Sequence, residues 1–428
     1  MNGRVGTEPA GRDAECAVVP GLTGRPEGRR QLVAVAGEPG HERPSGWEPS
    51  SVVGGGARAA RATLLALAPL PHESCGDQAR GSRPHADRLL GGHIRDAGAS
   101  VDRASTNRAS TDRALVDRAS VDRAGRLVDG LTDRELREVV PDVPALCWAE
   151  FDLDRFDAAR GHLDRTIAVA SRVRHREVLP GLLLARSSVA ARQGHLADAT
   201  IDAQEAAAMA GELGHVHERA FAMAVQLPVR LWQHGPTAVR GLLAAAPAPQ
   251  TLAVAWWRPI AAAATADALL LMGRARAARR IAIVALHLAG RGGAHHPALL
   301  ALAATTELAC GRLAAATVLQ RRAGSAAEAG GLDTQCGAAG LALARVLSAG
   351  GAYREAAAAA STAVARLDRC GAPLLAGRAR LVAAEVASAS ADHDLARREL
   401  ALARGAFVAC GAYWLATTVA ALQHRIGR

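Results

Sequence analysis

Lysine is absent from this 428-residue chain, so all 51 of its basic residues are arginine. An enzyme that forms a Schiff base and an ATPase with an intact phosphate-binding loop both need a lysine amine, so the composition argues against both classes. Aromatic residues make up only 3% of the chain, while half of its residues are hydrophobic and alanine supplies the excess. This balance favours closely packed helices over the core of a β-sheet.

Signals for secretion and for membrane insertion are missing as well. The seven cysteines are odd in number and form no C-x-x-C pair, which predicts reduced thiols in a cytosolic protein. The first twenty residues carry charges throughout and lack the apolar run of a signal peptide. The most apolar stretch, residues 260–272, is short and contains Asp267, so no membrane-spanning helix is expected. We therefore expect a cytoplasmic protein with no membrane partner.

The positive charge is concentrated in the C-terminal two-thirds of the chain. The formal net charge is +10, and residues 141–428 contribute +9 of it through 31 arginines and 22 acidic residues. One interpretation is an anionic partner. The other, which is the commoner case, is a set of solvated helix faces that are rich in arginine.

What the chain does contain is a turn that recurs seven times. Its clearest copy runs from Gly194 to Ala199 between two helical patterns rich in alanine and leucine. The copies begin at Asp154, Gly194, Gly235, Gly273, Gly311, Gly351 and Ala391. Successive copies are 38 to 41 residues apart, and a nearly constant period of this kind indicates a repeat architecture.

Each copy has the features of a helix–turn–helix unit. The glycine can adopt a positive φ and end the first helix, and the small residue five positions later lets the second helix approach the first closely. The third position holds Phe156, Leu196, Leu313 or Tyr353, which we expect to fill the corner of the hairpin. Because one hairpin cannot bury its apolar face alone, the units should stack into an all-α solenoid.

A second informative stretch lies near the N-terminus. Residues 28–36 form a polar entry and a short buried-strand pattern, and the Gly37-x-x-Gly40 that follows resembles the start of a phosphate-binding loop. The loop then fails, because Glu42 places negative charge where phosphate would sit and Pro44 removes both an N–H and a hydroxyl. Arg43 keeps a charge without the geometry of lysine. We interpret Gly37, Gly40 and Arg43 as a degenerate loop and expect no cofactor.

The opening residues and the repeats together resemble a known family. Residues 11–15 and 31–40 are similar to the start of large LuxR-type transcriptional regulators of the MalT kind, and the array from about residue 141 to 428 resembles their helical portion. Such regulators carry an N-terminal ATPase module, a tetratricopeptide-like array and a C-terminal helix-turn-helix. The resemblance therefore implies a tetratricopeptide-like, effector-sensing helical array.

The sequence departs from that family at both ends. The ATPase pattern stops after Gly40, and no helix-turn-helix pattern follows the array. Residues 131–135 resemble the opening residues of a helix-turn-helix, but Thr132 and Glu135 fit a capping box that starts an ordinary helix. We expect a remnant of a nucleotide-binding domain over 1–40, a low-complexity, disordered linker over 41–130 and the array over 131–428.

Within that linker, residues 101–125 repeat every five positions. Five residues turn a helix by about 500°, so no single face of such a helix stays apolar. Its arginines are matched by neighbouring aspartates, which argues against an arm that binds nucleic acid. We expect a solvated linker.

Candidate site residues are few. His215 with His217, and His295 with His296, lack ligand partners at a spacing known for zinc, so we expect no metal site, and no catalytic constellation appears. Trp256 and Trp257 are notable because aromatics are scarce, and they fit either core packing or a ligand groove. The groove candidates, all on predicted first helices of hairpins, are Trp256, Trp257, Arg258 and Arg186.

These observations predict a non-catalytic helical array that binds a protein or a small-molecule effector. The function expected from the resemblance is that of a LuxR-type regulator without working ATPase and DNA-binding modules, so direct DNA binding is not expected. The alternative is a free-standing tetratricopeptide-like adaptor.

Overall fold

The computed structural model describes residues 55–67, 118–172, 175–252, 257–290 and 293–426. All of them belong to one compact unit, and no strand occurs among them. Helices account for most of the described chain from residue 143 onward. The predicted all-α fold is therefore confirmed.

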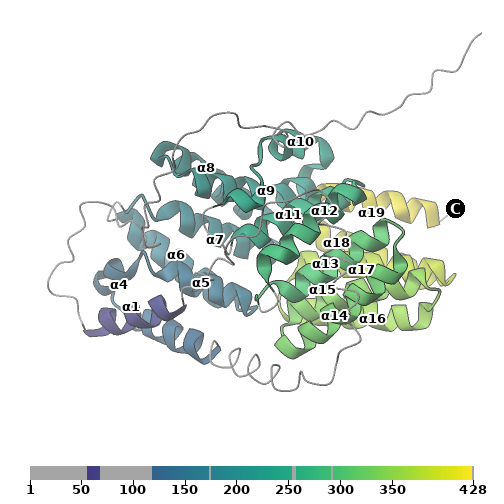
Figure 1. The fold of residues 1–428 in the computed structure, drawn as a ribbon, viewed down its shortest axis with the longest axis horizontal. Helices are drawn as coiled ribbons and strands as arrows, with labels where there is room; N and C mark the ends of the chain where they lie inside the picture. Colours follow the sequence, from purple (N-terminus) through teal and green to yellow (C-terminus); the bar gives the residue numbers. More distant parts are fainter. Residues whose placement is uncertain (1–54, 68–117, 173–174, 253–256, 291–292, 427–428) are drawn as a thin grey trace, which may run out of the picture. The chain divides into compact units, whose positions relative to one another are not determined.

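The helices form successive hairpins (Figure 1). The first helices are α5 (Val143–Asp152), α7 (Leu179–Arg192), α9 (Val216–His234), α11 (Trp257–Leu271), α13 (His296–Ala309), α15 (Asp333–Ala349) and α17 (Pro373–Ala389). The second helices are α6 (Phe156–Arg172), α8 (Leu196–Leu213), α10 (Pro236–Ala245), α12 (Ala275–Ala289), α14 (Leu313–Gly330), α16 (Tyr353–Arg369) and α18 (His393–Ala409). The other elements are α1 (Gly55–Leu67), a helix over 118–129, α4 (Asp133–Val139), the short 3-10 helix η2 (Pro249–Thr251) and α19 (Tyr413–Ile426).

All seven predicted turns lie between the two helices of a hairpin. The first residue of every copy has a positive φ, between 61° and 83°, even where it is Asp154 or Ala391. The next N–H usually returns to the carbonyl five residues earlier, as from His195 to Ala190 at 2.8 Å, which is the Schellman ending of a helix. The alanines five residues after the turn start are fully buried, as predicted for close helix approach: Ala159, Ala199, Ala278, Ala316, Ala356 and Ala396.

The prediction that the third turn residue fills the corner holds for only some copies. Phe156 and Leu196 are buried, but Leu313 and Tyr353 are 37% and 36% exposed. The difference follows from what covers each turn. Chain from elsewhere crowds Gly194, whereas a Cβ built on Gly311 would meet no atom within 4 Å. The expected role was therefore wrong for Leu313 and Tyr353, whose turns face open space.

The covered turns contact hairpins that lie much later in the chain. The Thr334 N–H and hydroxyl donate to the Asp154 carboxylate at 2.9 and 2.5 Å, across 180 residues. A Cβ on Gly194 would lie 2.9 Å from Cγ of Pro373, and one on Gly235 would lie 2.6 Å from Cδ1 of Trp414.

Three successive turns thus meet the starts of α15, α17 and α19, each 179 or 180 residues further along the chain. Helix α19 also packs against α9, and α17 touches α7. We call these three meetings the closure contacts.

Part of the predicted linker is folded. Helix α1 contacts α4 and α5, and the helix over 118–129 buries Val121, Ala124 and Val128. The last five-residue copy begins at Val121, and from there Val121, Ala124 and Val128 recur at the three- and four-residue spacing of an amphipathic helix. The prediction of a disordered linker was therefore wrong for these helices.

Helix α4 begins with the predicted capping box. The Glu135 N–H donates to the Thr132 hydroxyl, and the Thr132 N–H donates to the Glu135 carboxylate at 2.9 Å. Residues 131–135 therefore open an ordinary helix, as expected. The degenerate loop of Gly37, Gly40 and Arg43 lies outside the described residues.

Candidate ligand-binding site

Trp257 is a core residue. Its side chain is 7% exposed and stacks on Phe221, with ring centroids 4.6 Å apart and ring planes at 4°. The groove assignment was therefore wrong for Trp257, because the ring is used in packing between α9 and α11. Trp256 lies outside the described residues.

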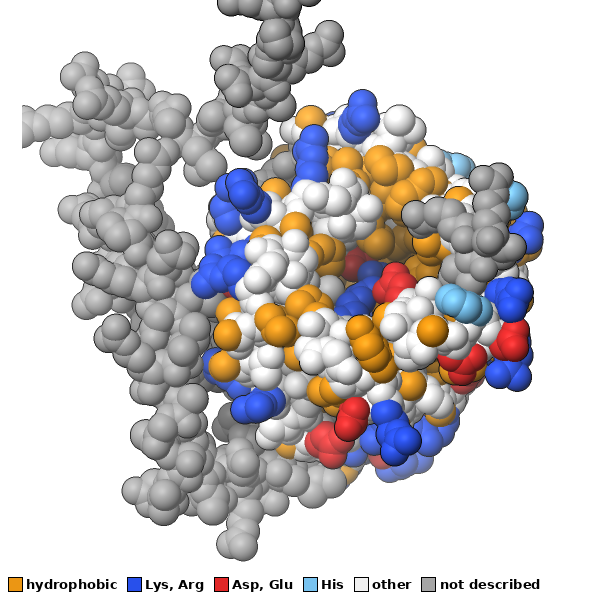
Figure 2. Space-filling view, turned by 90° about the vertical axis from the view of Figure 1, so that its right-hand side faces the viewer, with side chains coloured by type: hydrophobic (Ala, Val, Ile, Leu, Met, Phe, Trp, Pro, Cys, Tyr) orange, Lys and Arg blue, Asp and Glu red, His pale blue; other side chains and the backbone are white. Residues whose placement is uncertain are grey.

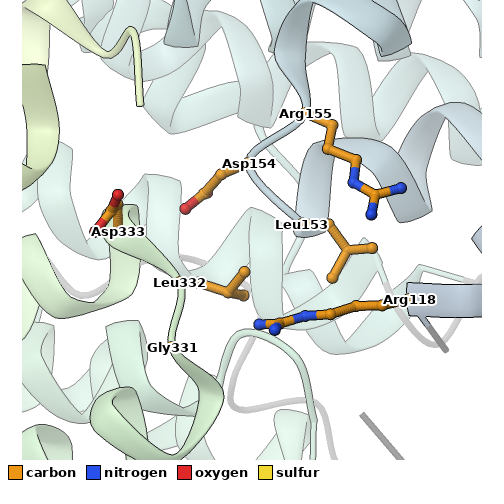
Figure 3. Close-up of a pocket in the computed structure, with 7 residues that line it drawn as sticks. All are labelled: Arg118, Leu153, Asp154, Arg155, Gly331, Leu332 and Asp333. Carbon is orange, nitrogen blue, oxygen red and sulfur yellow. The ribbon is translucent and has the colours of Figure 1, made fainter. Parts of the chain in front are cut away.

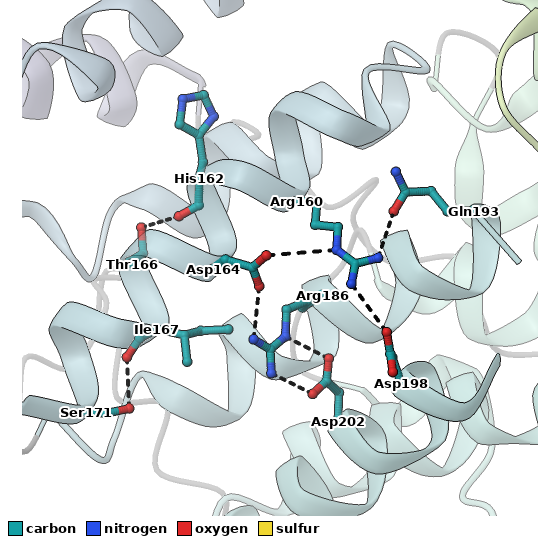
Figure 4. A network of polar contacts seen from close by, with 10 residues as sticks. All are labelled: Arg160, His162, Asp164, Thr166, Ile167, Ser171, Arg186, Gln193, Asp198 and Asp202. Atoms are coloured by element: carbon teal, nitrogen blue, oxygen red, sulfur yellow. Dashed lines mark hydrogen bonds and ion pairs between the residues drawn. The ribbon is translucent and has the colours of Figure 1, made fainter. Parts of the chain in front are cut away.

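Arg186 is held inside a polar network that joins three helices (Figure 4). Its Nε and Nη2 donate to the Asp202 carboxylate at 2.8 and 2.7 Å, and its Nη1 donates to Asp164 at 3.0 Å. The hydrogen bonds to Asp202 raise the pKa of Arg186. These bonds tie α7 to α8 and α6, so the guanidinium is committed to structure rather than to a ligand.

Arg258 also has an internal partner, since its Nε donates to the Leu252 carbonyl at 2.7 Å. The structure thus gives each of the three described candidates a packing or pairing role of its own. It does not join them into one site.

A cavity of about 270 Å³ lies where the helix over 118–129 meets the α5–α6 and α14–α15 turns (Figure 3). Arg118, Asp154, Arg155 and Asp333 line it. All four are already engaged, since Arg118 donates to the Gly330 carbonyl at 2.6 Å and Arg155 pairs with Asp122 at 2.5 Å, while Asp154 accepts from Thr334. Asp333 pairs with Arg369 and Arg366, whose bonds lower its pKa. We therefore interpret the cavity as part of a structural junction between this helix and the two turns.

A different group of charges lies on the first helices of the hairpins. On α11 and α17, Asp267 accepts two hydrogen bonds from Arg378 at 2.7 and 3.0 Å. Arg345 on α15 interacts electrostatically with Asp267, Arg378 and Glu385. Arg378 links these residues to a second group, because it also influences Arg192 at the end of α7.

That second group surrounds the end of α5. Asp152 lies 3.6 Å from Nε2 of His295 and interacts with Arg192 and Asp154. The Arg192 guanidinium also sits over the Phe151 ring, 5.2 Å from its centroid. We call the whole set the interior charge cluster: Asp152, Asp154, Arg192, Asp267, Arg345, Arg378 and Glu385.

Two members of the cluster, Arg192 and Arg345, form no hydrogen bond and no ion pair within 4.0 Å with the described part of the chain. Both residues are partly exposed. Burial nevertheless lowers the pKa of both. They are charged groups in a partly dehydrated place without a bonded counter-ion.

Burial also shifts the pKa of the carboxylates near Arg192 and Arg345. Burial raises the pKa of Asp152, and it raises that of Glu385 although this side chain is open to solvent. Figure 2 shows a hollow on one face of the molecule, with arginine and acidic side chains in its depth and hydrophobic side chains around its rim. First helices are the elements that line the concave side of such arrays. An anionic group entering there would find arginines able to bind it bidentately.

Sequence reasoning missed this cluster, although one signal pointed to it. Asp267 is the one charged residue in the most apolar stretch of the chain, residues 260–272. A carboxylate inside an apolar helix needs a partner, and its partner here is 111 residues away. No local pattern identifies Arg378 as that partner.

The described residues contain no group of three or more histidine, cysteine or acidic side chains placed to hold a metal ion. None of the helices described is long and apolar enough to cross a membrane. Nδ1 of His215 lies 3.9 Å from Oε1 of Glu218, and Nε2 of His295 lies 3.6 Å from Oδ1 of Asp152.

Comparison with known proteins gives structural likenesses alone. No protein-family model and no curated protein matches the sequence. The apo form of the quorum sensor NprR from B. thuringiensis is similar over 82% of this chain and 97% of its own, with 11% identity and a TM-score of 0.44.

Two further solved structures are similar in the same way. A signal transduction ATPase with numerous domains, which has a tetratricopeptide repeat sensor and comes from Pyrococcus horikoshii, shares 12% identity over 72% of this chain, with a TM-score of 0.39. This chain covers 52% of that protein. A Rap protein complexed with competence and sporulation factor matches 87% of this chain and 96% of its own, at 12% identity and a TM-score of 0.36.

Proposed function

We propose that the chain is a non-catalytic sensor array that binds a peptide or small effector through a carboxylate, at the interior charge cluster. The observation that carries this proposal is the pair of unbonded guanidinium groups, Arg192 and Arg345. An anion would supply the counter-charge that each group lacks, and a bidentate contact from arginine suits a carboxylate. The cluster offers no paired nucleophile and base, which supports binding over catalysis.

The regulatory context is part of the same proposal. We infer from the sequence resemblance that the array is the effector-sensing portion of a LuxR-type regulator. An adaptor that stands alone remains the alternative, and both use the same binding surface. Effector binding would act on a partner by stabilising one arrangement of the hairpins over others.

The binding site is tested by thermal unfolding with a matched pair of peptides. One is a short acetylated peptide ending in glutamate, which carries two carboxylates, and the other ends in glutamine amide, which carries none. The acidic peptide should raise the melting temperature of the native protein and should not raise that of Arg345→Gln. Arg354→Gln, at an exposed arginine on α16, is the control and should respond like the native protein.

Equal shifts with both peptides, or an unchanged response of Arg345→Gln, would contradict the site. Because Arg345→Gln removes a dehydrated charge, its own melting temperature should not fall. The readout is therefore the shift caused by peptide.

The degenerate phosphate loop leads to a separate expectation. Glu42 opposes phosphate and Pro44 provides no ligand for Mg²⁺, so the chain should not bind nucleotide. Isothermal titration with Mg·ATP is the measurement, and micromolar binding would refute the expectation.

A further inference from the structure

Most of the net positive charge of the array lies over α12, α13 and all but the last residues of α14. Residues 273–327 hold eight arginines against one acidic residue, a net charge of +7 out of the +9 of residues 141–428. The one acidic residue, Glu307, is buried and already bound by Arg279 and Arg312 at 2.7 and 3.2 Å. No other residue of 273–327 is acidic, and the next acidic residue along the chain is the exposed Glu328 on α14.

Helix α12 carries the densest part of this charge. It contains Arg276, Arg279 and Arg280 and no acidic residue. Arg276 and Arg280 are one turn apart and exposed, and neither forms an ion pair with the described residues. Arg186 and Arg378, on α7 and α17, are examples of arginines that do pair with a carboxylate.

The same helix leaves its aliphatic side chains incompletely covered. Its buried residues are all alanines, namely Ala278, Ala282 and Ala285. Ile283, Val284 and Leu288 are partly exposed and belong to none of the hydrophobic clusters of the described core. Helices α16 and α18 bury larger side chains, Leu367 and Phe407, although α18 also leaves Leu402 and Val408 about half exposed.

The neighbouring hairpin explains why α12 is uncovered. In a stack of hairpins a second helix is flanked by the second helices of adjacent units. Helix α10 has 10 residues, whereas α8 and α14 have 18 each. Helix α10 is therefore about two turns shorter than the other second helices and covers less of α12.

We propose that the exposed face of α12 docks an acidic amphipathic helix of a partner protein. Carboxylates one turn apart on that helix would pair with Arg276 and Arg280, and its aliphatic side chains would cover Ile283, Val284 and Leu288. The mixture of arginine and aliphatic side chains on one face favours such a helix over a nucleic acid backbone, which has no apolar groups to place there. The proposal does not depend on the interior charge cluster.

The test uses fluorescence anisotropy with three labelled probes at 150 mM salt, roughly one physiological ionic strength. The first is an 18-residue amphipathic helix of glutamate and leucine, the second is the same composition in scrambled order, and the third is an 18-base-pair DNA duplex. The amphipathic peptide should bind best. Its affinity should fall at least about tenfold, or 1.4 kcal/mol, in Arg276→Glu/Arg280→Glu.

A matched control changes the same charge elsewhere. Arg398→Glu/Arg404→Glu alters two exposed arginines on α18 that have no ion pair with the described residues, and it should bind the peptide like the native protein. Ile283→Ser/Val284→Ser should weaken peptide binding and leave any DNA binding unchanged. Circular dichroism verifies that all variants keep their helix content.

Three outcomes would overturn the proposal. They are equal binding of scrambled peptide or of DNA, equal losses in both charge-reversal variants, and no binding of the amphipathic peptide at 100 µM, roughly the affinity of a weak encounter.

Discussion

At the scale of single residues, the side chains that the sequence offers as ligand groups are used in internal contacts. The sequence predicts Trp257 and Arg186 equally well as ligand groups and as structural ones. The deciding facts are their neighbours: Phe221 stacks on Trp257, and Asp202 binds Arg186 through two hydrogen bonds. A residue type alone does not reveal such neighbours.

Trp257 should therefore be a stability residue. Trp257→Ala removes a buried ring that stacks on Phe221, and it should lower the free energy of unfolding by about 3–5 kcal/mol. Tyr413→Ala, at a ring that is 60% exposed, should change it by less than about 0.5 kcal/mol. Urea denaturation followed by circular dichroism compares the two, and equal effects would contradict the core assignment.

His162 should make stability depend on pH. Burial on its own lowers the pKa of this residue, but hydrogen bonds and charges of Glu150 and Asp129, at 2.9 and 3.1 Å, outweigh it and leave the pKa raised. Protonated His162 therefore contributes stability that is fully present below its usual pKa of about 6.5. That contribution is lost as the pH rises through the raised value.

The expected result is a native protein that loses stability as the pH rises above about 6.5, and a His162→Gln variant with a flatter profile. Urea midpoints across this range provide the measurement. His393→Gln, at an exposed histidine on α18, should keep the native profile. A His162→Gln profile as steep as the native one would exclude this residue as the cause.

At the scale of the element, the sequence predicts the hairpins well because their signals are local. A glycine ends one helix and an alanine five residues later admits the next, so every turn was found at its observed place. The exposed Leu313 and Tyr353 were not predictable in the same way. Whether a corner is covered depends on chain about 180 residues away.

Two glycines with the same backbone conformation separate these effects. Gly194 and Gly351 have φ values of 83° and 81° and the same turn hydrogen bond. Gly351→Ala should cost about 1–2 kcal/mol from its positive φ alone, and the natural Ala391 at 62° shows that the turn tolerates this residue. Gly194→Ala should cost about 1–3 kcal/mol more, because its Cβ would lie 2.6 Å from Sγ of Cys410.

Thermal or urea unfolding of both variants measures the difference. Adding Cys410→Ala should recover part of the loss in Gly194→Ala and none of it in Gly351→Ala. Equal costs for the two glycine variants would show that the turn at 194 is not constrained by the C-terminal hairpins.

At the scale of the whole array, the features that the sequence does not predict depend on contacts between distant parts of the chain. The period predicts a stack but not the rotation between neighbouring hairpins, and small rotations accumulate over several units. The closure contacts and the interior charge cluster both depend on that accumulated rotation. This is why Asp267 was conspicuous in the sequence while Arg378 was not.

The Asp267–Arg378 pair should be a strong stabilising link across the array. Asp267→Asn leaves a largely enclosed guanidinium without its counter-ion and should cost on the order of 3 kcal/mol of unfolding free energy. Asp394→Asn breaks an exposed pair with Arg397 and should cost less than about 1 kcal/mol. Chemical denaturation compares them, and similar small effects would show that the pair contributes little to holding α11 and α17 together.

The closure contacts also restrict how such a gene can change length. An open array of hairpins tolerates duplication of any internal unit, since each unit touches only its neighbours. Here, an extra 40-residue unit inserted between Gly235 and Thr334 would shift all three meetings out of register at once. Added units are compatible with these contacts only outside the span from Asp154 to Trp414, so the array can be extended at its ends but not in its middle.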